Sequence, residues 1–304
     1  MHPEQLVLRR SIAATLAIAV LGIVFGALSG SFSIIFDGAY SLIDATMSVL
    51  ALLVSRLIVR DAQGVQRRGR FSVGFWHLEP LVLALNGLLL STVAIYGFAN
   101  AVGLILSGGR VLAFDWAIAY AVATLAVCVG MLVYETRANR TLRSDFLALD
   151  GRAWAMSGAI TAALLVAFVL GGLVEGTPHA WLAPYADPAV LAVVCLVIAP
   201  LPIGTIRQAL SEILLLAPPG LVEEVEAVAR ATAARHGLLG FHAYVAKIGR
   251  SRQMEIHFIL PPDRPLGDVR TLDAIRDEVG AAIGGESADR WLTITFTGDP
   301  EWAR

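Results

Sequence analysis

Long apolar runs separated by short polar stretches occupy the first 214 residues of the chain. Six of these runs reach roughly 20 residues, the length a helix needs to cross about 30 Å of hydrocarbon. They span residues 10–29, 33–55, 79–106, 112–134, 147–173 and 188–213. Arg9 and Arg10 precede the first run as they would in a signal peptide, but that run is long, lacks a convincing cleavage site and is followed by five others. We therefore predict six membrane-spanning helices.

Beyond residue 214 the pattern changes to short segments of alternating period. Helical spacing covers residues 221–234 and 269–283, and strand alternation covers residues 241–247, 254–260 and 292–296. The intervening stretch Ala217-Pro218-Pro219-Gly220 cannot continue a helix. The sequence thus predicts a multi-pass α-helical membrane domain at residues 1–214. A C-terminal α+β domain of α-β-β-α-β order is predicted at residues 215–304.

Composition supports an apolar environment and excludes some functions. The chain is 57% hydrophobic with a mean hydropathy of +0.70, above the roughly 45–50% apolar content of soluble domains. A net charge of −2 gives no case for nucleic-acid binding. Cys128 and Cys195 both lie inside apolar runs and form neither a disulfide framework nor a CxxC metal motif, so we expect them to pack as small apolar residues.

Basic residues gather in alternate connections between the runs, and their bias sets the expected orientation. One side has Arg9, Arg10, Arg56, Arg60, Arg67, Arg68, Arg70, Arg137, Arg140, Arg143 and Arg207. On the other side only Arg110 appears. The positive-inside rule therefore predicts that both termini are cytoplasmic. We expect the protein to span the cell's inner (plasma) membrane, with the lipid bilayer as its surroundings.

Three polar residues share one stripe of the second run. Asp37, Tyr40 and Asp44 are separated by three and four residues, so they face the same side of a helix. Asp44 lies about 11 residues from either end of the run, roughly 16 Å deep at about 1.5 Å per residue. A carboxylate at that depth needs a partner, and a cation is the natural one. The alternatives are a helix–helix hydrogen bond for Asp44, aromatic packing for Tyr40, and an exit-side or capping role for Asp37.

The fifth run offers a matching stripe of Asp150, Trp154 and Ser157 at the same spacings. Asp150 lies near the end of its run, so a salt bridge to Arg152 is an alternative to metal binding. At the start of the third run, His77 and Glu79 are placed either to attract entering cations or to pair with the loop arginines.

The residues around these stripes carry a family resemblance. The segments Gly30-Ser31, Phe36-Asp37-Gly38, Tyr40-Ser41-Leu42-Ile43-Asp44 and Gly74-Phe75-Trp76-His77-Leu78-Glu79-Pro80-Leu81 resemble the second- and third-helix signatures of cation diffusion facilitators. Leu149-Asp150-Gly151-Arg152-Ala153-Trp154-Ala155-Met156 and the stretch 202–217 resemble a bacterial cobalt/zinc/cadmium-type branch. The resemblance covers nearly the whole chain.

The resemblance implies a homodimeric proton antiporter that exports a divalent metal such as zinc, cobalt, cadmium, iron or manganese. In that family a tetrahedral site takes two ligands from the second helix and a His-x-x-x-Asp pair from the fifth. The first pair falls on Tyr40 and Asp44, whereas the fifth run departs from the pattern and has no histidine. Alignments from Gly158 and from Arg143 disagree there, and Asp150 is the predicted ligand, with Asp37 as a further candidate.

The C-terminal domain resembles the family's metallochaperone-like cytoplasmic domain. His242 and His257 are its candidate metal ligands, and a solvated strand histidine is the alternative for His257. The family's C-terminal metal cluster is replaced here by Phe296-Thr297-Gly298-Asp299-Pro300.

The expected function is divalent metal efflux by metal/proton antiport and alternating access, with the metal as substrate and no enzyme activity. One alternative is a metal-binding scaffold or sensor of the same fold that does not transport, which the missing His-x-x-x-Asp pair favours. The other is an intramembrane aspartyl protease using Asp44 and Asp150, which the absence of a Gly-x-Gly-Asp motif disfavours.

Overall fold

The computed structural model describes residues 3–62, 74–142, 145–263, 268–284 and 290–303. The chain forms two compact units. The first comprises residues 1–49 and 86–204, and the second comprises residues 50–85 and 205–304. Arg67, Arg68, Arg70 and Arg143, which contribute to the predicted orientation, lie outside the described residues.

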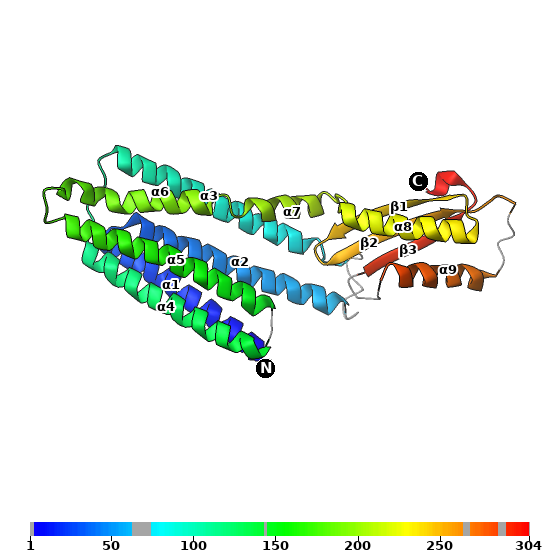
Figure 1. The fold of residues 1–304 in the computed structure, drawn as a ribbon, viewed down its shortest axis with the longest axis horizontal. Coiled ribbons are helices and arrows are strands. Elements are labelled where there is room, and N and C mark those ends of the chain that lie inside the picture. Colours follow the sequence, from blue (N-terminus) through cyan, green and yellow to red (C-terminus); the bar gives the residue numbers. More distant parts are fainter. Residues whose placement is uncertain (1–2, 63–73, 143–144, 264–267, 285–289, 304) are drawn as a thin grey trace. The chain divides into compact units, whose positions relative to one another are not determined.

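The described residues contain six stretches of helix long and apolar enough to cross a membrane, as predicted (Figure 1). Five are single helices: α1 (Pro3–Ser29), α2 (Phe32–Ala62), α3 (Leu78–Leu106), α4 (Phe114–Leu142) and α5 (Asp145–Val174). Gly30, at φ +74°, makes the tight turn between α1 and α2, a left-handed conformation that glycine adopts without strain.

The sixth stretch departs from the single helix predicted over residues 188–213. It begins with the 3₁₀ helix η1 (Ala180–Tyr185), continues as α6 (Ala186–Ile198) and resumes as α7 (Ile203–Ile213). Pro200 and Pro202 explain the break, because proline has no N–H to donate and its ring clashes with the preceding turn of a helix.

Helices α1, α2, α4 and α5 pack closely in the first unit. α4 lies along α5, and α1 contacts both. Gly22 of α1 faces Gly38 of α2 so closely that a Cβ on Gly22 would lie 2.8 Å from the Gly38 Cα. The glycines of α1 therefore serve packing within one protomer. A separate buried group, including Phe36, Ala94 and Cys195, joins α2, α3 and α6.

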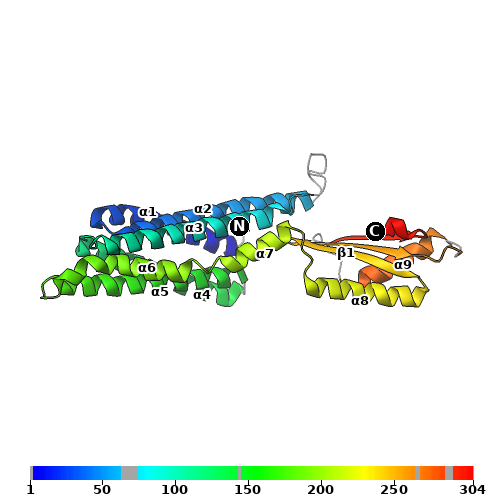
Figure 2. The ribbon, with the colours of Figure 1, turned by 90° about the horizontal axis from the view of Figure 1, so that it is seen from above.

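The second unit contains the predicted α-β-β-α-β module: α8 (Pro219–His236), β1 (Gly240–Ile248), β2 (Ser251–Ile259), α9 (Val269–Ala282) and β3 (Arg290–Thr297), followed by the 3₁₀ helix η2 (Pro300–Ala303). The sheet has the order β1-β2-β3, with β2 antiparallel to β1 and parallel to β3. Met254, Ile256 and Phe258 are buried against α8 and α9, which cover the same face of the sheet (Figure 2).

The β1–β2 turn is held by helix ends that belong to the same unit. Glu212 of α7 accepts hydrogen bonds from Lys247 Nζ at 3.2 Å and from the Gly249 backbone N–H at 3.0 Å. Arg250 donates to Glu79 of α3 at 3.2 Å and to Ser55 Oγ of α2 at 3.1 Å. The turn is thus tied to α2, α3 and α7 by ionic and polar contacts.

Candidate metal-transport site

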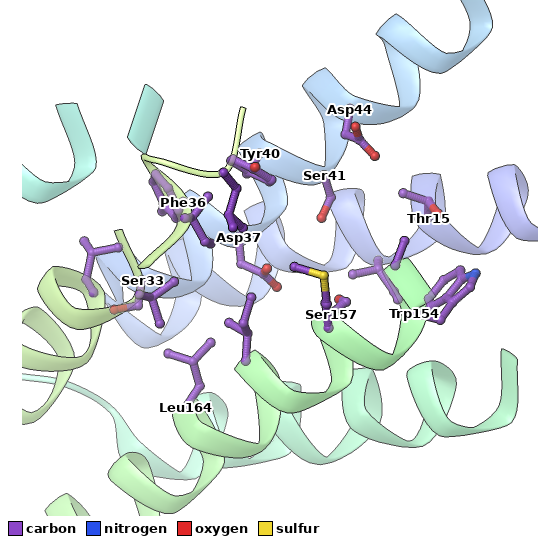
Figure 3. A pocket seen from close by; sticks show the side chains of 18 of the residues that line it. Thr15, Ser33, Phe36, Asp37, Tyr40, Ser41, Asp44, Trp154, Ser157 and Leu164 are labelled. Carbon is purple, nitrogen blue, oxygen red and sulfur yellow. The ribbon is translucent and has the colours of Figure 1, made fainter. Parts of the chain in front are cut away.

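The polar stripe of α2 faces the interior of the first unit. Asp37 accepts a hydrogen bond from Tyr120 Oη of α4 at 2.7 Å. Tyr40 packs beside Phe36, with the ring centroids 5.9 Å apart. One turn further along, Asp44 projects from the same helix (Figure 3). The predicted spacing therefore places all three polar side chains on one side of α2.

These side chains line a cavity of about 270 Å³ between α1, α2, α5 and α6. Its polar lining residues are Thr15, Ser33, Asp37, Tyr40, Ser41, Asp44, Asp150, Trp154 and Ser157. Asp44 and Asp150 thus reach one space from two different helices. Two carboxylates in a mostly apolar cavity are costly unless a cation or protons neutralise them.

On the α5 side, two of the three stripe residues have defined partners. The Trp154 indole N–H donates to Ser11 Oγ of α1 at 2.9 Å, and the Cys128 thiol of α4 donates to Ser157 Oγ at 3.6 Å. Arg152 is exposed, and the described ion pairs do not include one between Arg152 and Asp150. Asp150 therefore lines the cavity without the salt bridge considered as its alternative role.

A complete metal site is not assembled in this conformation. Within the described parts of the chain, no three His, Cys, Asp or Glu side chains converge closely enough to hold a metal ion. The nearest approximation is the cavity itself, where carboxylate and phenol oxygens are the available donors. Oxygen donors of this kind suit divalent cations of the harder class.

Comparison with known families supplies the deciding observation: the cation efflux transmembrane domain matches residues 8–214. The chain belongs to the cation efflux family. Members of this family are transporters and not enzymes, and their substrates are divalent metal ions. This protein is accordingly a multi-pass membrane protein that exports a metal cation, and the predicted family and fold are confirmed. A search of curated proteins gives no match to this chain.

The candidate entrance residues of this cation efflux protein lie in the second unit. Glu79 pairs with Arg250 at 3.2 Å. The loop arginines Arg67, Arg68 and Arg70, considered as its alternative partners, lie outside the described residues. The second oxygen of Glu79 is buried without a hydrogen-bond partner among the described residues. His77 is likewise not free, because its side chain or backbone takes part in a noncovalent interaction.

The candidate ligands of the C-terminal domain are neighbours across two strands. His242 of β1 is directly opposite His257 of β2. His257 Nδ1 shares a hydrogen bond with Thr295 Oγ1 at 2.5 Å, and its Nε2 lies 4.0 Å from a Glu255 oxygen. The Tyr244 ring meets the imidazole edge-on at 5.8 Å. One nitrogen of His257 is therefore occupied by Thr295, and the other faces Glu255.

Two acidic residues that sequence reasoning did not single out are also buried in the first unit. Asp187 of α6 is 1% exposed and Glu135 of α4 is fully buried. Asp187 follows a loop in the sequence, and Glu135 precedes Thr136 and Arg137 near the end of its apolar run, so both resemble residues at a membrane surface. A signal was available for Glu135, because it shares a helical stripe with Tyr120, Thr124 and Cys128 at spacings of four, four and seven.

Proposed function

We propose that this cation efflux protein is a metal/proton antiporter whose transport site is built from Asp44, Tyr40 and Asp150, with Asp37 as a further ligand. The observation that carries the proposal is that Asp44 of α2 and Asp150 of α5 line one cavity. Ligands on different helices allow a change of helix packing to assemble or open the site, as alternating access requires.

Proton coupling follows from the ligand chemistry. A carboxylate must be deprotonated to bind a metal ion, so metal and protons compete for Asp44 and Asp150. Where protons are plentiful on the outer side, protonation of these carboxylates releases the metal outward. Return of the protonated site to the inner side then carries protons in the direction opposite to the metal.

The substrate falls within the family's range of zinc, cobalt, cadmium, iron and manganese. Neither α2 nor α5 contains a histidine or cysteine, so the proposed ligand set is oxygen throughout. Such a set discriminates less strongly in favour of zinc over manganese or ferrous iron than an imidazole site does. We infer a relative shift toward the harder metals.

The proposal also covers the orientation of the protein in the membrane and its assembly. The arginine bias supports cytoplasmic termini in an inner membrane. We further propose a transport domain at residues 1–214 and a cytoplasmic domain at residues 215–304 that joins two protomers in a homodimer. His242 and His257 are its candidate metal-sensing ligands, and His77 and Glu79 mark the cytoplasmic entrance.

Metal flux into inverted vesicles tests the proposal. Wild type is expected to accumulate divalent metal, and an imposed pH gradient is expected to accelerate this. Asp44→Ala should abolish flux without changing folding. The control Asp115→Asn removes an exposed carboxylate at the start of α4 and should transport normally.

Near-normal flux in Asp44→Ala would refute the site assignment. Metal binding by wild type with no flux under any gradient would instead support a non-transporting scaffold or sensor. Flux that ignores the pH gradient would remove the antiport step and leave metal efflux standing.

A further inference from the structure

Glu135 is the most unusual side chain on the buried stripe of α4. Glu135 is fully buried, and neither of its carboxylate oxygens makes a hydrogen bond of normal geometry with a described residue. Elsewhere on this stripe, Tyr120 donates to Asp37 and Cys128 donates to Ser157. A carboxylate shielded from water is strongly disfavoured unless a cation or a proton neutralises it, so this position calls for one of the two.

The packing of α4 against α5 places Glu135 beside Asp150. Cys128 of α4 meets Ser157 of α5, and a Cβ on the neighbouring Gly158 would lie 3.4 Å from the Cys128 Cβ. The two helices are antiparallel, so the chain runs in opposite directions along their contact. Two helical turns, or seven residues, forward from Cys128 on α4 therefore lie beside the residue seven positions back from Ser157 on α5; we call each such level of contact a layer. That layer contains Glu135 and Asp150.

Contacts in the second layer confirm this register. A Cβ on Gly151 would lie 3.8 Å from Glu135 Oε2, which matches the place of Gly158 beside Cys128. The absence of a side chain at Gly151 leaves room for the carboxylate between the two helices. Polar groups around Glu135 come from Asp150, Ser11 and Trp154. The indole N–H of Trp154 is already donated to Ser11, and none of the three side chains is basic.

The carboxylate pair borders the transport cavity. Asp150 and Trp154 both line this cavity, and Glu135 contacts the α5 side of the pair without being one of the lining residues. The cavity has a volume of about 270 Å³. This is many times the roughly 10–15 Å³ that one water molecule needs. A cation at Asp150 can therefore keep part of its hydration shell.

We propose, on the basis of the proposed function, that Glu135 is a further metal ligand and forms with Asp150 a two-carboxylate site between α4 and α5 for a hard divalent cation. Two carboxylates balance the charge of one such ion. Hard cations of this class are commonly held by one or two carboxylates while water fills the other coordination positions. Because α5 contains no histidine, the site has no imidazole ligand from that helix, and Glu135 of α4 supplies an oxygen ligand instead.

The test is Mn²⁺ binding to the purified full-length protein, followed by the electron paramagnetic resonance signal of free Mn²⁺. Glu135→Gln keeps the shape of the side chain and removes its charge. We expect at least about tenfold weaker binding, a change that even the loss of an outer-sphere partner of a metal site produces. Glu135→Asp keeps the charge on a shorter side chain and should bind with intermediate affinity, and the control Asp115→Asn should bind as wild type does.

Wild-type Mn²⁺ affinity in folded Glu135→Gln would overturn the proposal, because Glu135 would then not bind the metal. This result leaves the proposed function intact, because that rests separately on flux in Asp44→Ala. Conversely, a wild type that binds Mn²⁺ but transports none of the family's divalent metals, with weaker Mn²⁺ binding in Glu135→Gln, would reject the proposed function and retain the Glu135 site. If Glu135→Gln does not fold, folded Glu135→Asp decides: weaker binding supports the assignment, and unchanged binding overturns it.

Discussion

Asp187 joins α6 to the beginning of α2, and its removal should measurably destabilise the membrane domain. Its carboxylate accepts hydrogen bonds from Ser31 Oγ at 2.5 Å, from the Phe32 N–H at 3.0 Å and from the Ser33 N–H at 3.3 Å. The Ser33 hydroxyl donates to the Asp187 backbone carbonyl at 2.9 Å. The side chain therefore caps α2 from another helix and complements the positive end of its dipole.

The magnitude follows from the donors that Asp187→Ala would leave unpaired. A hydrogen bond to a charged group contributes about 1.5–3 kcal/mol, but three bonds to one carboxylate are not additive. A buried donor left without a partner costs about 1–3 kcal/mol, and three donors share this carboxylate, so we take about 3–5 kcal/mol as the expected loss. At about 2–4 °C per kcal/mol for a domain of roughly 200 residues, the melting temperature should fall by roughly 6–20 °C.

Thermal melting of detergent-purified protein, read by tryptophan fluorescence, measures this loss. Ser31→Ala removes one donor and should cost about 0.5–2 kcal/mol, as the loss of a helix cap does. Asp115→Asn, at an exposed position, should change stability by no more than about 0.5 kcal/mol. An Asp187→Ala protein that melts within about 2 °C of wild type would show that water replaces the carboxylate, and the capping argument would be wrong.

Three further predictions concern metal choice, assembly and pH. Tyr40→His should shift transport preference toward zinc in a manganese/zinc competition at fixed free-ion levels, because imidazole is the softer donor; an unchanged ratio would make Tyr40 a packing residue. Removing residues 218–304 should weaken dimerisation on light scattering in detergent; an unchanged dimer fraction would place the contact within the membrane. The hydrogen bond from His236, with Arg235 nearby, lowers the pKa of the Glu278 carboxyl, so its stabilising effect is present above the unfolded pKa and is lost as pH falls through the folded one. Denaturant unfolding of the full chain should therefore show a smaller acid-side loss of C-terminal-domain stability in Glu278→Gln than in wild type.

The fold follows from the sequence wherever one pattern dominates a whole segment. Six apolar runs predict six spans, because every backbone polar group inside lipid must be satisfied within a helix. Alternation at Met254, Ile256 and Phe258 likewise predicts the buried face of β2, which α8 and α9 cover. The break between α6 and α7 was the exception. Hydropathy is insensitive to Pro200 and Pro202, although their backbone chemistry interrupts the helix.

The site was harder to predict because it depends on which helices meet. The spacing of Asp37, Tyr40 and Asp44 needs only the geometry of one helix, and the structure places all three in one cavity. That Asp150 shares this cavity depends on tertiary packing, and two alignments of α5 gave different answers. Similarly, the pairing of Glu79 with Arg250 joins residues 171 positions apart, which local charge patterns do not indicate.

Glu135 shows why position in a hydropathy profile is an incomplete guide to burial. Its place seven residues before the end of α4, with arginines following it, is typical of a side chain that reaches the membrane surface. Which way it points is set by the rotation of α4, and Tyr120, Thr124 and Cys128 fix that rotation because they share its buried stripe. Gly151 and Gly158, seven residues apart on α5, then mark the face on which α5 approaches α4. The polar stripe of α4 and the small-residue stripe of α5 have the same period and meet in antiparallel register. Considered together, the two stripes place Glu135 against Asp150.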